Sequence, residues 1–152
     1  MNDGIGPQFA RVAIDGVIGL LTAFIPDIVA EMGRPAFTRF GRAFRGQAMA
    51  APEAWVTPVN TVMDDEGQTR HQISELVVTL GLVGGDPEAT MDAALDYVRA
   101  VDLAISRNET GLEEPIKRVF VREHNYGALR TKGTGFAVFP EVFVLVEMEE
   151  EG

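Results

Sequence analysis

The sequence contains no cysteine and only two histidines in 152 residues. No disulfide can stabilise the fold, no thiol can act as a nucleophile, and zinc sites built on thiolates are excluded. The absence of cysteine is typical of a protein that assembles inside a cell, in a reducing environment.

Long uninterrupted apolar runs are also missing. The most hydrophobic stretch, residues 7–32, is interrupted by Asp15, Pro26 and Asp27, and the residues before it lack the basic segment of a signal peptide. A membrane span needs about 20 mostly apolar residues. We therefore expect a protein with no export signal and no membrane contact.

Positive charge is scarce as well, since 13 Lys and Arg face 23 Asp and Glu, for a formal net charge of -10. Proteins that bind nucleic acid normally neutralise phosphates with clustered Lys and Arg, so this balance argues against general attraction to DNA or RNA. The charge is unevenly distributed, however. Residues 1–50 hold five arginines and four acidic residues, whereas residues 51–152 hold eight basic and nineteen acidic residues.

The basic part is concentrated in "AFTRFGRAFRGQAM", residues 36–49, which has no acidic residue. It lies in a segment, 33–53, without clear periodicity, which is too long for an ordinary connection in a compact domain and predicts a functional loop. Aromatic residues and arginines are enriched at interface cores. We expect a contact to another subunit or partner through Phe37, Arg39, Phe40, Arg42, Phe44 and Arg45. An alternative is single-stranded nucleic-acid binding, with arginines on phosphates and phenylalanines on bases.

Two segments have helical periodicity. Residues 7–32 place apolar side chains at helical spacing from Phe9 to Phe24, and Pro26 predicts a kink or a new short helix before a stop at Gly33. The second segment starts at Asp86, an N-cap residue followed by Pro87 at the first helical position, and ends near Asn108.

The other segments alternate in the manner of strands. "AWVTPVNTVM" and "HQISELVVTLGLVG" flank an acidic turn and predict one hairpin, and "PIKRVFVREHNYG" with "GFAVFPEVFVLVEMEEE" predicts a second. The last strand is apolar on both faces, which predicts an additional packing partner. The element order favours one α+β domain over residues 1–152, with an about four-stranded, largely antiparallel sheet, two main helices on one face and the extended loop 33–53.

Chemical motifs are weak. His124 and Tyr126 could belong to a general-base site, but neighbouring strand residues point to opposite faces, so Glu123 is poorly placed to orient His124. "DDEG" at residues 64–67 lacks the spacing of a calcium loop, and Asp86 would repel a phosphate at the helix start. We expect no catalytic residue, no cofactor and no metal site.

The chain closes with an acidic segment, residues 147–152, which contains Glu147, Glu149, Glu150 and Glu151. Such a run is usually a solvated tail. If several copies placed it around a channel, it would form a negative wall past which DNA slides without binding.

The order of helix, extended loop, hairpin, a helix after "GGDPEAT", and the final "HNYG" to "FAVFPEVFVLVEMEEE" hairpin resembles the tail terminator and neck proteins of long-tailed bacteriophages. This resemblance runs from about Phe9 to Glu150. It implies a hexameric ring in the virion, at the head-proximal end of the tail tube, assembled in the host cytoplasm. The ring would stop tube polymerisation, meet the tail tube protein and the head connector, and let DNA pass through its lumen.

Members of this family are not enzymes and work through interfaces. The segment Gly33 to Pro52 matches no family motif and is a departure from the pattern. The alternative hypothesis is a small dimeric α+β ligand-binding module or enzyme with a pocket near His124 and Tyr126. A ring of six without such a pocket would favour the first hypothesis, and a dimer with a closed cavity would favour the second.

Overall fold

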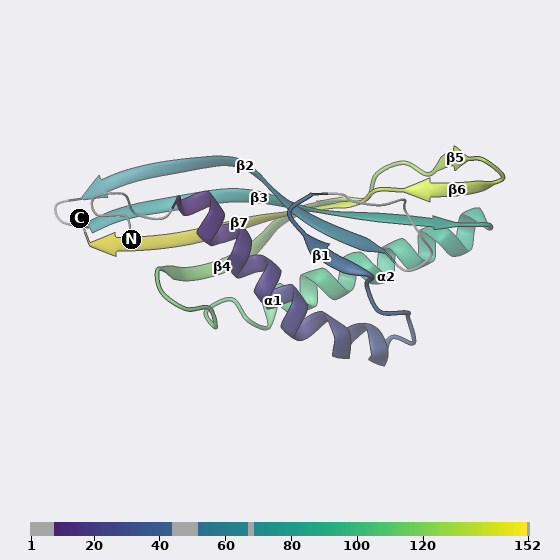
Figure 1. Cartoon of the computed structure of the whole chain (residues 1–152), viewed down its shortest axis with the longest axis horizontal. Helices are drawn as coiled ribbons and strands as arrows, with labels where there is room; N and C mark the ends of the chain where they lie inside the picture. Colours follow the sequence, from purple (N-terminus) through teal and green to yellow (C-terminus); the bar gives the residue numbers. More distant parts are fainter. Residues whose placement is uncertain (1–7, 44–51, 67–68, 152) are drawn as a thin grey trace.

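The computed structural model of the chain describes residues 8–43, 52–66 and 69–151 (Figure 1). Its first element is helix α1, Phe9–Glu31, which Gln8 caps by accepting a hydrogen bond from the Arg11 amide. Nine apolar residues of α1 are buried along one side. The helix ends where Gly33 adopts a φ of 73°, a left-handed conformation that glycine reaches without strain.

The new short helix that was one of the two alternatives at Pro26 is not found, because α1 continues through this residue to Glu31. Pro26 removes one intrahelical hydrogen bond, but the buried neighbours Ile25, Ile28 and Val29 keep this turn packed on the core. Phe24 was expected on the buried stripe, yet it is 45% exposed.

By length and composition alone, α1 could cross a membrane. A core helix of a water-soluble domain has the same properties, and α1 contributes its nine buried residues to the hydrophobic core. Its apolar character is therefore explained by packing within this fold.

Helix α2, Pro87–Ser106, starts and ends as predicted. The Asp86 side chain accepts a hydrogen bond of 2.8 Å from the Ala89 amide, and Arg107 is the C-cap residue. Small and branched residues line its buried side, so that α2 packs closely against α1 and the sheet.

Four long strands form the antiparallel centre of the sheet: β2 (Glu53–Glu66), β3 (Thr69–Gly84), β7 (Glu141–Glu151) and β4 (Ile116–Asn125). Strand β3 pairs with β2 on one side and β7 on the other, and β7 pairs with β4. At about 3.4 Å per residue, the 16 residues of β3 extend over about 50 Å and reach across the molecule (Figure 1).

Three short strands complete the sheet: β1 (Arg39–Gly41), β5 (Arg130–Lys132) and β6 (Gly135–Val138). The sheet therefore has seven strands, more than the four expected, and it is mixed because β1 runs parallel to β2. The sequence signal missed β1 because glycine and proline surround it. The expected last strand divides at Pro140 into β6 and β7, which both pair with β3.

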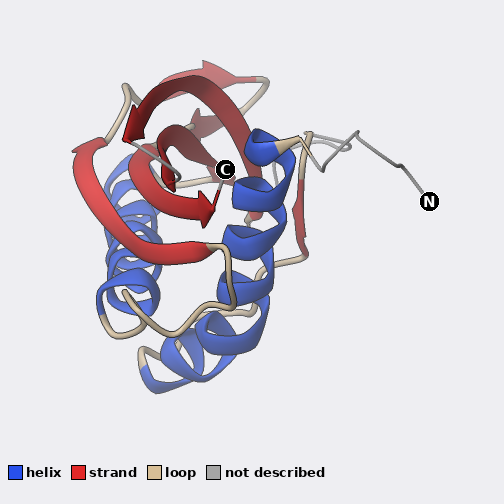
Figure 2. Ribbon diagram, turned by 90° about the vertical axis from the view of Figure 1, so that its left-hand side faces the viewer, coloured by secondary structure: helices blue, strands red, loops and turns tan. Residues whose placement is uncertain are grey.

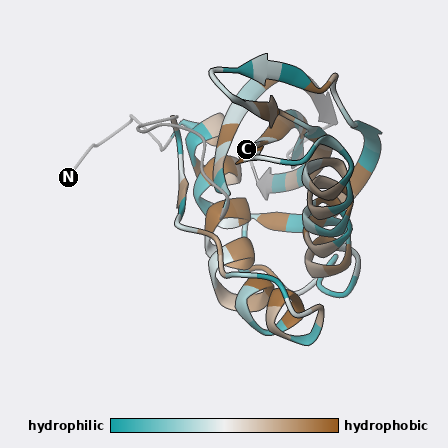
Figure 3. Cartoon of the chain, turned by 90° about the vertical axis from the view of Figure 1, so that its right-hand side faces the viewer, coloured by the Kyte–Doolittle hydropathy of each residue, from teal (hydrophilic) through white to brown (hydrophobic). Residues whose placement is uncertain are grey.

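The α+β class is confirmed. Both helices lie beneath the strongly curved sheet (Figure 2), and hydrophobic residues run along them (Figure 3). The alternation in β3 and β7 is also confirmed, because one face of each strand is buried in the core, namely Leu76, Val78, Leu80 and Leu82 in β3 and Val142, Val144, Val146 and Met148 in β7. We call this the inner face of the sheet, and the opposite face the outer face.

Candidate assembly surface

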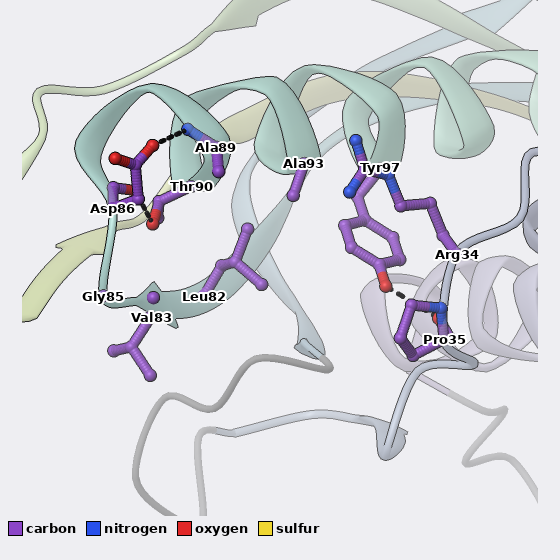
Figure 4. Close-up of a pocket in the computed structure, with 11 residues that line it drawn as sticks. Arg34, Pro35, Leu82, Val83, Gly85, Asp86, Ala89, Thr90, Ala93 and Tyr97 are labelled. Atoms are coloured by element: carbon purple, nitrogen blue, oxygen red, sulfur yellow. Dashed lines mark hydrogen bonds between the residues drawn. The ribbon is translucent and has the colours of Figure 1, made fainter.

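The basic segment begins directly after α1, where Gly33 turns the chain toward α2. The Arg34 guanidinium lies 2.8 Å from the Asp96 carboxylate, and the Tyr97 hydroxyl donates a hydrogen bond of 2.7 Å to the Pro35 carbonyl (Figure 4). These two contacts attach the start of the segment to α2. Burial raises the pKa of the Tyr97 phenol above its ordinary value, partly opposed by the nearby Arg34 charge.

Phe37 of the segment packs on the same tyrosine, and Phe40 packs on Phe37. Phe37 stacks on Phe40 at a ring-centroid distance of 4.9 Å and meets Tyr97 edge-on at 5.1 Å. Both phenylalanines are half-buried against the core. The structure therefore brings these two predicted interface residues together, on the body of their own subunit.

The arginines of the segment also have partners within the chain. Arg39 donates hydrogen bonds to the Glu53 carboxylate at 3.3 Å and to the Ala43 carbonyl at 2.9 Å. Arg42 forms an ion pair with Asp15 of α1, in which both side chains are 53% exposed. These contacts hold the described part of the segment in place, and its contact with another subunit stays a prediction.

The other two predicted interface residues, Phe44 and Arg45, lie outside the described residues. They follow Arg42 by two and three positions, so they continue the segment beyond the point where it is attached to α1.

The acidic end of the chain is part of the sheet. Residues up to Glu151 belong to β7, and the register places Glu147 opposite Ile73 and Glu149 opposite His71 on the outer face. The His71 imidazole lies 3.8 Å from the Glu149 carboxylate. The side chains of Glu150 and Glu151 are outside the described residues. A position along a lumen stays a prediction for all four glutamates.

The outer face carries aromatic and aliphatic side chains that the helices do not cover. Register places Phe120 of β4 beside Leu145 of β7, and Val77 of β3 beside Phe143. Two arginines lie over the rings: the Arg118 guanidinium is 4.3 Å from the centroid of Phe120, and that of Arg122 is 5.4 Å from the centroid of Phe143. These stacked arginines shield part of the apolar surface.

Two apolar residues of the β2–β3 hairpin extend this surface and were missed by sequence reasoning. Val62 and Ile73 are register partners on the outer face, with 63% and 39% of their surface exposed. The signal was present in the alternation of "NTVM" and "HQIS", but the hairpin partner of each residue depends on a bulge between Pro58 and Asn60.

His124 and Tyr126 do contact each other, with 3.2 Å between the imidazole Nδ1 and the phenol oxygen. The His124 Nε2 atom is buried and has no hydrogen-bond partner. Neither residue lines any of the surface hollows beside α1 and α2. The pocket required by the ligand-binding alternative is therefore not among these hollows.

One hollow of about 380 Å³ lies between the start of α2 and the end of β3 (Figure 4). Its polar groups are already paired, because Asp86 caps α2 and Arg34 pairs with Asp96. Within residues 8–43, 52–66 and 69–151, no three His, Asp or Glu side chains gather as a metal site would require. This hollow offers an uneven, mostly apolar surface and no reactive group.

Comparison with solved structures relates this fold to one chain of a particle described as "Virion of native gene transfer agent (GTA) particle". The match has a TM-score of 0.57 and covers 90% of this chain and 93% of that chain, at 13% sequence identity. This chain shares its fold with a virion component. No protein-family model and no curated protein sequence matches the chain.

Proposed function

We propose that this chain is a structural virion protein of the tail-terminator type. It forms a hexameric ring at the head-proximal end of a tail tube, stops polymerisation of the tube and joins the tail to the head connector. DNA passes through the lumen without specific binding. The observation that carries the proposal is the fold shared with a virion chain over nearly the whole length of both chains.

The surface of the chain supports a role in assembly. The outer face is apolar and exposed at Val62 and Ile73, and burial of this surface would favour association with a neighbouring protein. The segment with Phe37, Arg39, Phe40, Arg42, Phe44 and Arg45 provides aromatic anchors and positive charge in a chain that is otherwise acidic. In a ring, such a contact is heterologous, because two different surfaces meet at each subunit boundary.

The experiment is to image the purified protein by negative-stain electron microscopy and to weigh it by native mass spectrometry. We expect six-subunit rings with a central hole. Added to polymerising tail tube protein, the rings should end tube growth in proportion to their concentration. A dimer that leaves tube length unchanged would overturn the proposal.

A further inference from the structure

One side of α1 carries a groove that no part of the chain within residues 8–43, 52–66 and 69–151 fills. Its first part, about 390 Å³, lies between α1 and residues 112–116. Its second part, about 290 Å³, lies between the end of α1 and Arg107 and Asn108. Phe24 lines both parts, so they lie next to each other along the helix.

The floor of the groove is apolar and is open beside Gly19. Leu20, Leu112 and Ile116 line it together with the small residues Gly16, Gly19 and Ala23. A Cβ atom placed on Gly19 would meet nothing within 4 Å, and Phe24 is 45% exposed. An aromatic side chain from outside could therefore lie against the backbone of α1.

The rim of the groove is acidic. Five carboxylates line it, against the single cation Arg107: Asp15, Asp27, Glu31, Glu113 and Glu114. Within the described part of the chain, Asp27, Glu31 and Glu113 have no ion-pair partner. Such a rim favours an occupant with positive charge beside its apolar anchor.

We propose that this groove receives the basic aromatic segment of a second copy of the chain, with Phe44 on the floor and Arg45 at the carboxylates of the rim. The inference rests on the proposed ring, for which it names both surfaces of the subunit boundary. The rim already accepts an arginine of this same segment, since Arg42 pairs with Asp15 within one subunit.

Charge favours this segment over the exposed apolar tip of the β2–β3 hairpin of a second copy. The β2–β3 hairpin presents Val62 and Met63, but the sequence "DDE" at residues 64–66 follows directly. Three acidic residues would be repelled by the acidic rim, whereas the segment around Phe44 contains only basic charge.

The absence of native cysteine allows a direct test by disulfide crosslinking. Two single-cysteine variants, Ala23→Cys in the groove and Ala43→Cys next to Phe44, are mixed and oxidised, so that only a bond between two copies can join them. We expect a covalent dimer on a non-reducing gel. The matched control is Ala30→Cys, an exposed alanine of α1 outside both parts of the groove, which should give no dimer with Ala43→Cys. Equal crosslinking at residues 23 and 30, or none at residue 23, would overturn the inference.

A second test fills the groove. Gly19→Leu should keep the fold, because the space beside Gly19 is open, and should weaken subunit association roughly tenfold or more by occupying the site of the aromatic anchor. Thr22→Leu adds the same side chain at an exposed position of α1 outside the groove and should associate like the native chain. Native-like rings from Gly19→Leu would refute the groove while leaving the ring itself intact. No ring from the unmodified chain would instead refute the proposed function, and the inference with it.

Charge exchange is a third test. Arg45→Glu should weaken the ring, and Glu113→Lys in the same chain should restore part of the lost affinity, since the two surfaces then exchange signs. Failure of Glu113→Lys to restore any affinity, measured by sedimentation at low salt, would count against the assigned contact.

Discussion

At the scale of single residues, Tyr97 connects the basic segment to the core. Its ring meets Phe37 edge-on, its hydroxyl donates to the Pro35 carbonyl, and its neighbour Asp96 pairs with Arg34. The buried Tyr97 side chain thus fixes the start of segment 33–53, for which the sequence showed no periodicity. Sequence reasoning placed Tyr97 on the helix but had no means to identify this partner 62 residues away.

Tyr97→Phe should therefore lower the free energy of unfolding by about 1 kcal/mol, the usual net contribution of one hydrogen bond. In a domain of this size the melting temperature falls by about 2–4 °C. Tyr126→Phe, at the exposed tyrosine, is the control and should change the stability by less than about 0.5 kcal/mol. An unchanged melting temperature in Tyr97→Phe would show that the contact with Pro35 does not hold the segment.

The raised pKa of Tyr97 makes the free energy of unfolding depend on pH in the alkaline range. The folded state holds the phenol proton more tightly than the unfolded state, so this stabilising contribution is complete below the ordinary pKa of about 10 and is lost as the pH rises through the folded value. In thermal melts above pH 10, the melting temperature of Tyr97→Phe should therefore fall less steeply with rising pH than that of the native chain.

At the scale of elements, helix α2 shows local sequence and tertiary structure in agreement. Asp86 and Pro87 predicted its start, and the structure confirms the hydrogen bond from the Ala89 amide to the Asp86 carboxylate. Capping is decided by residues within one turn, which explains why sequence alone was sufficient. Helix α1 is the contrasting case, because Pro26 has a strong local preference that the packing of its neighbours overrides.

Asp86→Ala should destabilise the fold by about 0.5–2 kcal/mol, because the first turn of α2 loses a hydrogen-bond acceptor. Asp92→Ala removes an exposed carboxylate from the same helix outside the cap and is the matched control. Urea denaturation of the two variants would measure the difference, and equal midpoints would contradict a capping role for Asp86.

At the scale of the whole molecule, the distribution of charge matters more than its total. Two of the acidic surfaces are the rim of the α1 groove and the end of β7 with Glu147 and Glu149. One basic residue of the segment, Arg42, lies at the first surface within the chain, through its ion pair with Asp15. A ring built by the proposed contact would neutralise the groove and leave the end of β7 as its free negative surface.

Replacing Glu147, Glu149, Glu150 and Glu151 with glutamine should preserve folding and ring formation, because Glu147 and Glu149 lie on the outer face and glutamine keeps the size of each side chain. If they line the lumen, the variant should retain DNA during passage, since a negative wall no longer repels the phosphates. Retention is measured by DNA binding to purified rings at low salt, with Glu88→Gln combined with Asp92→Asn as a charge control. An image with the end of β7 on the outer rim would contradict the prediction.

The amino-acid sequence by itself determined the α+β class, both helices, the four long strands and the two alternating faces of β3, because helix caps and alternating hydrophobicity act over a few neighbouring residues. It also located the basic segment. Only the tertiary structure decided the seven-stranded order, the parallel pairing of β1 and the packing of Phe37 on Tyr97. The same holds for the groove of α1, whose walls come from residues 12–31 and 107–116. Such features join segments that are far apart in the chain. Local sequence patterns cannot predict them, because their geometry depends on where each helix and strand ends.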